Sequence, residues 1–168
     1  MAHLIKKEDF NIFVEQLTNK YNVVGPVFNK KKKMFLFSYL EKGDGIKGKL
    51  AFNLPLYPAK DFFLPIKQKF FEFRDGKIKD IREKSKRKTV FFMNRCDINA
   101  VHRNDLIMLD SPLDPYYKEK RENAILVEIP CVKEASCHCT NIGLINCYDL
   151  KIIDSNGNYI LDTLTKKG

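Results

Sequence analysis

The sequence lacks any long apolar run, and this absence bounds where the protein can reside. A membrane-spanning helix needs about 18 or more consecutive apolar residues, and the chain contains no such stretch. Residues 1–9 carry lysines and acidic residues where a secretory signal would need an apolar segment. We therefore expect no membrane insertion and a cytoplasmic location.

The chain also lacks the motifs of an independent catalyst. It has no glycine-rich phosphate-binding loop, no Ser/His/Asp arrangement and no pair of carboxylates with a convincing partner. We expect a protein that is not catalytic alone and that serves as a component of a larger system.

Positive charge is in excess. The chain has 30 Lys and Arg against 21 Asp and Glu, a net charge of +9, with basic runs at residues 30–33 and 82–88. A nucleic-acid module would place stacking aromatics beside its basic residues, whereas most of the 13 Phe lie in apolar runs typical of a core. The pattern favours a solvated surface or a docking patch for an acidic protein partner, and not nucleic acid.

Length and apolar periodicity indicate one domain over residues 1–168, since 168 residues with 44% hydrophobic side chains support a single core. Phe10, Phe13, Val14 and Leu17 follow a helical spacing after Asp9, which predicts a helix over residues 8–20. Branched and aromatic runs predict buried strands at residues 89–93 and 124–129. Two further helices are expected at residues 97–109 and 114–123.

The other extended segments complete the predicted sheet. Strands are expected at residues 34–40 and 77–81, with residues 77–81 and 89–93 in the middle of the sheet, and a shorter extended piece at 22–28 is interrupted at Gly25-Pro26. Asn156-Gly157 lies between two apolar runs and predicts a hairpin near the carboxyl terminus. The fold class is therefore α+β: an N-terminal helix, then a mixed β-sheet with short helices and a C-terminal hairpin.

Cysteine is absent from the first half of the chain and clustered in the second. The five cysteines are Cys96, Cys131, Cys137, Cys139 and Cys147. Disulfides are rare in the cytoplasm, so the alternatives are metal ligands, reactive thiols and inert buried thiols.

The positions of four cysteines suggest a common site. Cys96 and Cys131 come just after the two predicted buried strands, and Cys137 and Cys139 lie on the loop that follows the second. Four thiolates at one sheet edge suit either a [4Fe-4S] cluster or a structural zinc ion. The close spacing of bacterial ferredoxins is absent, so metal binding and inert thiols both remain open, and Cys147 is a possible substitute ligand.

Several motifs resemble a known family. Residues 95–100, Arg-Cys-Asp-Ile-Asn-Ala, resemble a segment of the iron-sulfur subunit of anaerobic sulfite reductase and of the related sulfhydrogenase and NiFe-hydrogenase beta subunits of the 4Fe-4S dicluster family. Residues 137–143, Cys-His-Cys-Thr-Asn-Ile-Gly, are similar to the family's Cys-Phe-Cys-x-x-Met-Gly. The pair Cys147-Tyr148 favours the sulfite reductase branch.

The resemblance implies an iron-sulfur electron-transfer subunit in which Cys96, Cys131, Cys137 and Cys139 hold one [4Fe-4S] cluster. Its implied partners are a flavoprotein subunit that oxidises NAD(P)H and a siroheme subunit that reduces sulfite to sulfide in anaerobic metabolism. The chain corresponds to the N-terminal half of the family and lacks the Cys-x-x-Cys-x-x-Cys runs of its ferredoxin-like dicluster domain. The alternative is a non-redox docking module of a sulfite reductase or hydrogenase complex, with zinc or no metal.

Overall fold

The computed structural model describes residues 2–40, 50–81, 87–132 and 137–168. In chain order, its elements are β1 (Ala2–Lys6), α1 (Phe10–Lys20), β2 (Asn22–Asn29), β3 (Met34–Tyr39), α2 (Lys60–Phe63), β4 (Phe71–Arg74), β5 (Lys77–Asp80), β6 (Thr89–Met93), α3 (Arg95–Met108), α4 (Pro115–Glu122), β7 (Ala124–Glu128), β8 (Leu150–Ser155) and β9 (Asn158–Thr163).

One mixed sheet of seven strands organises the molecule, in the order β1-β9-β8-β7-β6-β2-β3. The central strands β2, β6, β7 and β8 run parallel, while β3, β9 and β1 are antiparallel to their neighbours. The crossover from β6 to β7 contains α3 and α4. The remaining strands, β4 and β5, form a separate two-stranded ribbon.

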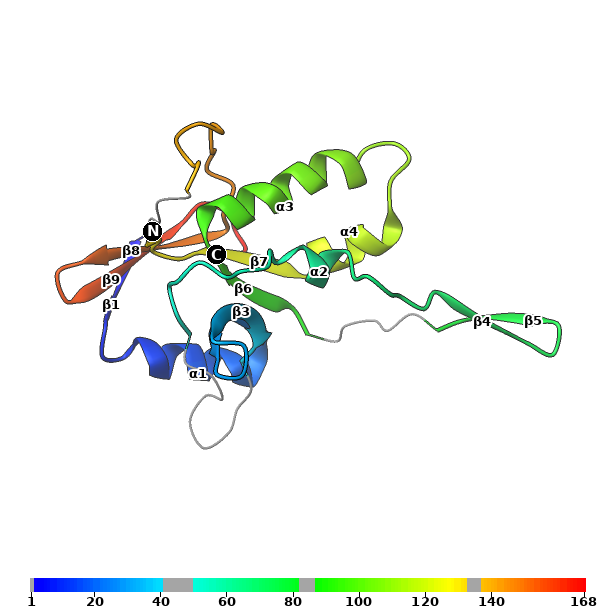
Figure 1. Ribbon diagram of the computed structural model, residues 1–168, viewed down its shortest axis with the longest axis horizontal. Coiled ribbons are helices and arrows are strands. Elements are labelled where there is room, and N and C mark those ends of the chain that lie inside the picture. The colour runs from blue at the N-terminus through cyan, green and yellow to red at the C-terminus, as the bar shows by residue number, and fades with distance from the viewer. Residues whose placement is uncertain (1, 41–49, 82–86, 133–136) are drawn as a thin grey trace.

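β6 and β7 are buried on both faces because helices cover both sides of the sheet (Figure 1). Successive side chains of a strand point to opposite faces, so Val90 and Phe92 of β6 pack toward α1. Phe91 and Met93 of the same strand pack toward α2, α3 and α4. This explains why the strand is apolar throughout rather than alternating.

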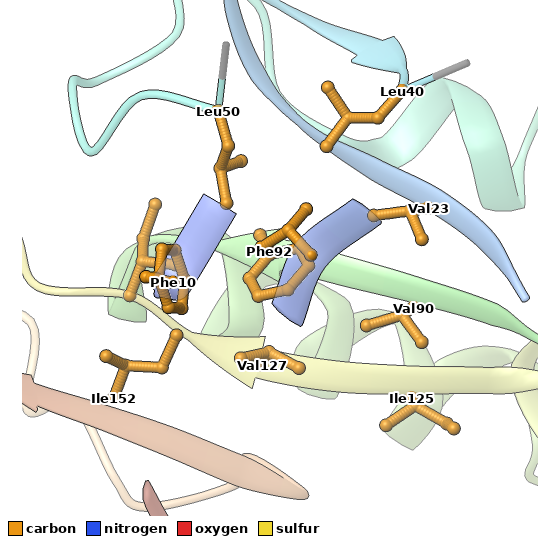
Figure 2. Close-up of a cluster of buried hydrophobic side chains, with 11 residues drawn as sticks. Phe10, Val23, Leu40, Leu50, Val90, Phe92, Ile125, Val127 and Ile152 are labelled. Carbon is orange, nitrogen blue, oxygen red and sulfur yellow. The ribbon is translucent and has the colours of Figure 1, made fainter. Parts of the chain in front are cut away.

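The core on the α1 side is shown in Figure 2, where Phe10 of α1 lies above the sheet beside Phe92 and Val127. The Phe10 ring meets the Phe92 ring edge-on, with 6.4 Å between their centroids. Such apolar contacts hold α1 on this face of the sheet. Because β6 and β7 are parallel neighbours, their carboxyl ends lie at the same edge of the sheet.

The predicted α+β architecture is confirmed, including the N-terminal helix and the C-terminal hairpin of β8 and β9. The hairpin turns at Asn156 and Gly157, which both adopt positive φ angles, of 29° and 82°. No helix within the described ranges is long and apolar enough to cross a membrane.

Two details of the predicted sheet were wrong, and one strand was missed. Residues 77–80 form β5, which pairs with β4 and not with the middle of the large sheet. β2 continues through Gly25-Pro26, because its pairing with β6 ends at Val24 and the missing N–H of Pro26 therefore interrupts no bond on that side. β1, which pairs with β9 at the other end of the chain, was not predicted.

The structure describes the whole of the first basic run but only part of the second. Lys30 to Lys33 are exposed at the turn between β2 and β3. Of the run at residues 82–88, residues 82–86 lie outside the described part of the chain.

Candidate functional site

Cys96 lies where β6 ends and α3 begins. Asn94 occupies the N-cap position of α3, and Cys96 is the second residue of the helix. The backbone N–H of Asp97 donates to the Cys96 sulfur, so the first turn of the helix supplies a hydrogen bond to this thiol.

Cys131 follows β7, which lies beside β6 in parallel register. The N–H of Ile129 donates to the carbonyl of Met93 at 3.0 Å, which keeps the two chain segments together beyond the ends of the strands. Pro130 then leads to Cys131. The expected neighbourhood of these two strands is confirmed, and it brings the segments that carry Cys96 and Cys131 to the same sheet edge.

Cys137 and Cys139 lie on the long connection from β7 to β8, in which the N–H of Asn141 donates to the carbonyl of His138 at 2.9 Å. The later part of this connection is held against α3. Asn99 donates from Nδ2 to the Ile145 carbonyl at 3.1 Å and accepts at Oδ1 from the Ile145 N–H at 2.9 Å. Nη2 of Arg95 donates to the Leu144 carbonyl at 3.1 Å.

All four of these cysteines line one cavity with a volume of about 600 Å³. Its apolar wall includes Ile129, Leu144 and Ile152, and its polar wall includes Arg95 and the ion pair between Lys151 and Glu128, whose Nζ and Oε1 atoms are 3.0 Å apart. The cavity therefore combines four soft sulfur donors with both apolar and charged side chains.

A zinc ion and an iron-sulfur cluster require different spacings between the sulfur atoms that bind them. Among the described residues, no three His, Cys, Asp or Glu side chains form a group that could bind one metal ion. A tetrahedral zinc site with Zn–S bonds of about 2.3 Å needs its sulfurs within about 4 Å of each other. An iron-sulfur cluster binds each thiolate at a different iron, so its cysteines stand further apart around a larger space.

Electrostatic coupling links the same thiols. The pKa of Cys96 is raised to about 12, first by burial and then by the charges of Asp97 and Cys139. Burial also raises the pKa of Cys131, followed by the effects of Cys137 and Cys139. At neutral pH these two thiols are protonated without a cation, and a bound metal would supply the positive charge that stabilises four thiolates.

Two residues just before Cys96 carry buried polar atoms without a hydrogen-bond partner among the described residues: Nδ2 and Oδ1 of Asn94, and Nε of Arg95. Unpaired buried polar atoms are rare in folded proteins and costly. The sequence gave no sign that Asn99 holds the distant loop against α3 or that the side chain of Asn94 lacks a partner.

Cys147 does not line the cavity. It packs against the core that contains Tyr148 and Leu126, and its sulfur is 3.9 Å from the Ile145 carbonyl. The suggested substitute ligand is therefore not among the residues that line the cavity.

Comparison with known proteins finds a similar chain. Sulfhydrogenase 2 subunit beta of Pyrococcus furiosus is 27% identical to this chain over 139 residues. The aligned region is 83% of this chain and 40% of the relative, so the chain spans less than half the length of that protein.

Neither a protein-family model nor a solved structure matches the chain. The cavity with its four cysteines therefore belongs to a chain that is similar, over most of its own length, to part of a sulfhydrogenase beta subunit.

Proposed function

We propose that this chain is an iron-sulfur electron-transfer component of a multi-subunit oxidoreductase. In this proposal Cys96, Cys131, Cys137 and Cys139 bind one [4Fe-4S] cluster. The observation that supports it is that four cysteines from separate segments of the chain line one cavity.

The residues around the cavity fit such a group. Ile129, Leu144 and Ile152 would exclude water, and the buried Nε–H of Arg95 is a donor without a partner among the described residues. Hydrogen bonds to sulfur and a restricted solvent are the features by which proteins adjust the potential of such groups. A bound cluster would accept and release single electrons.

The similarity to a sulfhydrogenase beta subunit supports membership of a redox complex. Within that class we favour the sulfite reductase branch, on the Cys147-Tyr148 pair. The chain would then relay electrons from a flavoprotein subunit that oxidises NAD(P)H to a siroheme subunit that reduces sulfite to sulfide. We propose that residues 1–168 form a single domain equivalent to the N-terminal part of that family.

The test is iron and acid-labile sulfide analysis of the full chain after anaerobic reconstitution. We expect about four irons and four sulfides per chain, lost in Cys96→Ala and retained in Cys147→Ala, because Cys147 lies outside the cavity. One bound zinc per chain, or no metal at all, would leave a structural or docking module instead. If iron and sulfide were lost equally in Cys96→Ala and Cys147→Ala, lining the cavity would not distinguish the cysteines that bind the cluster from the one that does not.

A further inference from the structure

The wall of the four-cysteine cavity, the cavity lined by Cys96, Cys131, Cys137 and Cys139, also carries charged side chains. Within the described ranges these are Arg95, Glu128, Lys151 and Asp154. None of them is a proposed cluster ligand. Their charges nevertheless act on any group that is bound in the cavity, because bulk water screens a charge in a cavity wall only partly.

Two of these charges, on Glu128 and Lys151, form an ion pair across neighbouring strands. Glu128 is the last residue of β7, and it lies opposite Lys151 of β8 in the parallel register. Oε1 of Glu128 and Nζ of Lys151 are 3.0 Å apart, and this Nζ also lies 5.7 Å from the centroid of the Tyr148 ring. The two strands therefore hold both charges in the wall of the cavity.

The Glu128 carboxylate is buried, whereas its partner reaches water. The side chain of Glu128 is 8% exposed and that of Lys151 is 28% exposed. The other carboxylate of the described cavity wall, on Asp154, pairs with Lys7, and the Asp154 side chain is 50% exposed. Water and salt screen an exposed charge strongly and a buried charge weakly. Of the two carboxylates, Glu128 therefore exerts the stronger field inside the cavity.

Arg95 contributes a charge and also holds the loop that carries two of the cysteines. Its Nη2 donates to the Leu144 carbonyl at 3.1 Å and to Oδ1 of Asn146 at 3.0 Å. Replacing Arg95 would change both the charge of the cavity and the position of the loop. Glu128 and Lys151 lie on strands of the large sheet, so the effect of their charges can be measured with the loop contacts of Arg95 in place.

We propose that Glu128 and Lys151 set the reduction potential of the group bound in the four-cysteine cavity, an inference that rests on the proposed function. A [4Fe-4S] group becomes one unit more negative when it takes up one electron, and nearby charge is one of the features that set its potential. The Glu128 carboxylate opposes this uptake and lowers the potential. The Lys151 ammonium group favours the uptake and limits the lowering. Neither residue binds iron in this proposal.

Potentiometric redox titration of the reconstituted full chain, followed by electron paramagnetic resonance, tests this at about pH 8, well above the ordinary pKa of a Glu carboxyl. We expect Glu128→Gln to shift the midpoint potential to a higher value and Lys151→Met to a lower one, because the two variants remove charges of opposite sign. Lys151→Arg keeps the positive charge and should leave the potential nearly unchanged.

Asp154→Asn is the matched control. It also removes one carboxylate charge from the cavity wall, but that carboxylate is half exposed. Its shift should therefore be smaller than that of Glu128→Gln by about twofold or more. The double variant Glu128→Gln/Lys151→Met leaves no unpaired charge at this position, so it keeps the comparison available if Lys151→Met does not fold. Its potential should be close to that of the unaltered chain and below that of Glu128→Gln.

Iron and acid-labile sulfide are measured in every variant before the titration, which separates the two proposals. An unaltered chain without a cluster would overturn the proposed function and this inference with it. Full iron content with an unshifted potential in Glu128→Gln would overturn this inference alone. The same holds for shifts of Glu128→Gln and Lys151→Met in one direction, and for a Glu128→Gln shift no larger than that of Asp154→Asn.

Discussion

Asn94 is a completely buried polar residue whose side chain makes no hydrogen bond within the described structure. Its neighbour in α3, Asn99, is almost as deeply buried and makes three: to the Arg95 carbonyl, to the Ile145 carbonyl and from the Ile145 N–H. The two asparagines therefore differ in partners and not in exposure.

Replacing the two asparagines should have opposite effects. Asn94→Leu should raise the free energy of unfolding of the metal-free protein by about 1 kcal/mol, because it removes two orphaned polar atoms and no hydrogen bond. Asn99→Leu should lower the free energy of unfolding by about 2 kcal/mol, because it leaves the N–H and the carbonyl of Ile145 without their hydrogen-bond partner. Urea unfolding of both variants measures this, and a destabilised Asn94→Leu would show that Asn94 has a partner.

Tyr117 makes the stability of the fold depend on pH. Burial, followed by the hydrogen bond to Asp105 at 2.7 Å, raises the pKa of its phenol above the ordinary value. The unfolded chain therefore loses this proton first, near a pH of about 10, and the native state loses stability as the pH rises beyond that point.

Tyr117→Phe should cost about 1 kcal/mol at pH 7, through loss of the bond to Asp105. Between about pH 9 and 11 it should lose stability with pH less steeply than the unaltered chain, because no phenol at this position titrates. The slope does not vanish, since burial raises the pKa of Tyr148 and Tyr159 as well. Urea unfolding at several pH values provides the comparison, and identical slopes for the two proteins would refute the prediction.

At the scale of elements, β6 and the β4–β5 ribbon differ in how far their Phe side chains are buried. Phe92 of β6 is fully buried between the sheet and α1, whereas Phe73 of β4 is mostly exposed. Both strands are rich in Phe, so composition alone does not distinguish a central strand from a free ribbon.

Replacing Phe92 and Phe73 by Ala should show how much each side chain contributes to stability. Phe92→Ala should lower the free energy of unfolding by about 3 to 5 kcal/mol, because it opens a cavity in the core. Phe73→Ala should change it by less than about 0.5 kcal/mol, as for other exposed sites. Chemical denaturation of the isolated chain measures both values, and a large loss in Phe73→Ala would mean that the ribbon packs on the domain.

For the whole molecule, the sequence predicted the parts that depend on local pattern. The fully apolar runs identified β6 and β7 as buried strands, and their parallel pairing placed Cys96 and Cys131 at one edge. β1 escaped prediction because its partner β9 is at the other end of the chain. The alternating residues of β5 suit a sheet centre and a free ribbon equally, so its place depended on the tertiary structure.

For the candidate site too, the sequence predicted the local features and not the long-range contacts. Local sequence indicated that Cys137 and Cys139 lie on a loop, but their approach to Cys96 depends on hydrogen bonds between α3 and residues 144–146, far along the chain. Likewise, only packing distinguishes Cys147 from the other cysteines. Such long-range contacts leave no periodic signal in a single sequence.

The most direct test of the proposed cluster is low-temperature electron paramagnetic resonance of the reconstituted chain after dithionite reduction. We predict a reduced-cluster signal that is lost or altered in the Ala variants of Cys96, Cys131, Cys137 and Cys139 and is unchanged in Cys147→Ala. A signal that survives unchanged in all four variants, or that disappears only with Cys147, would contradict the proposed ligation.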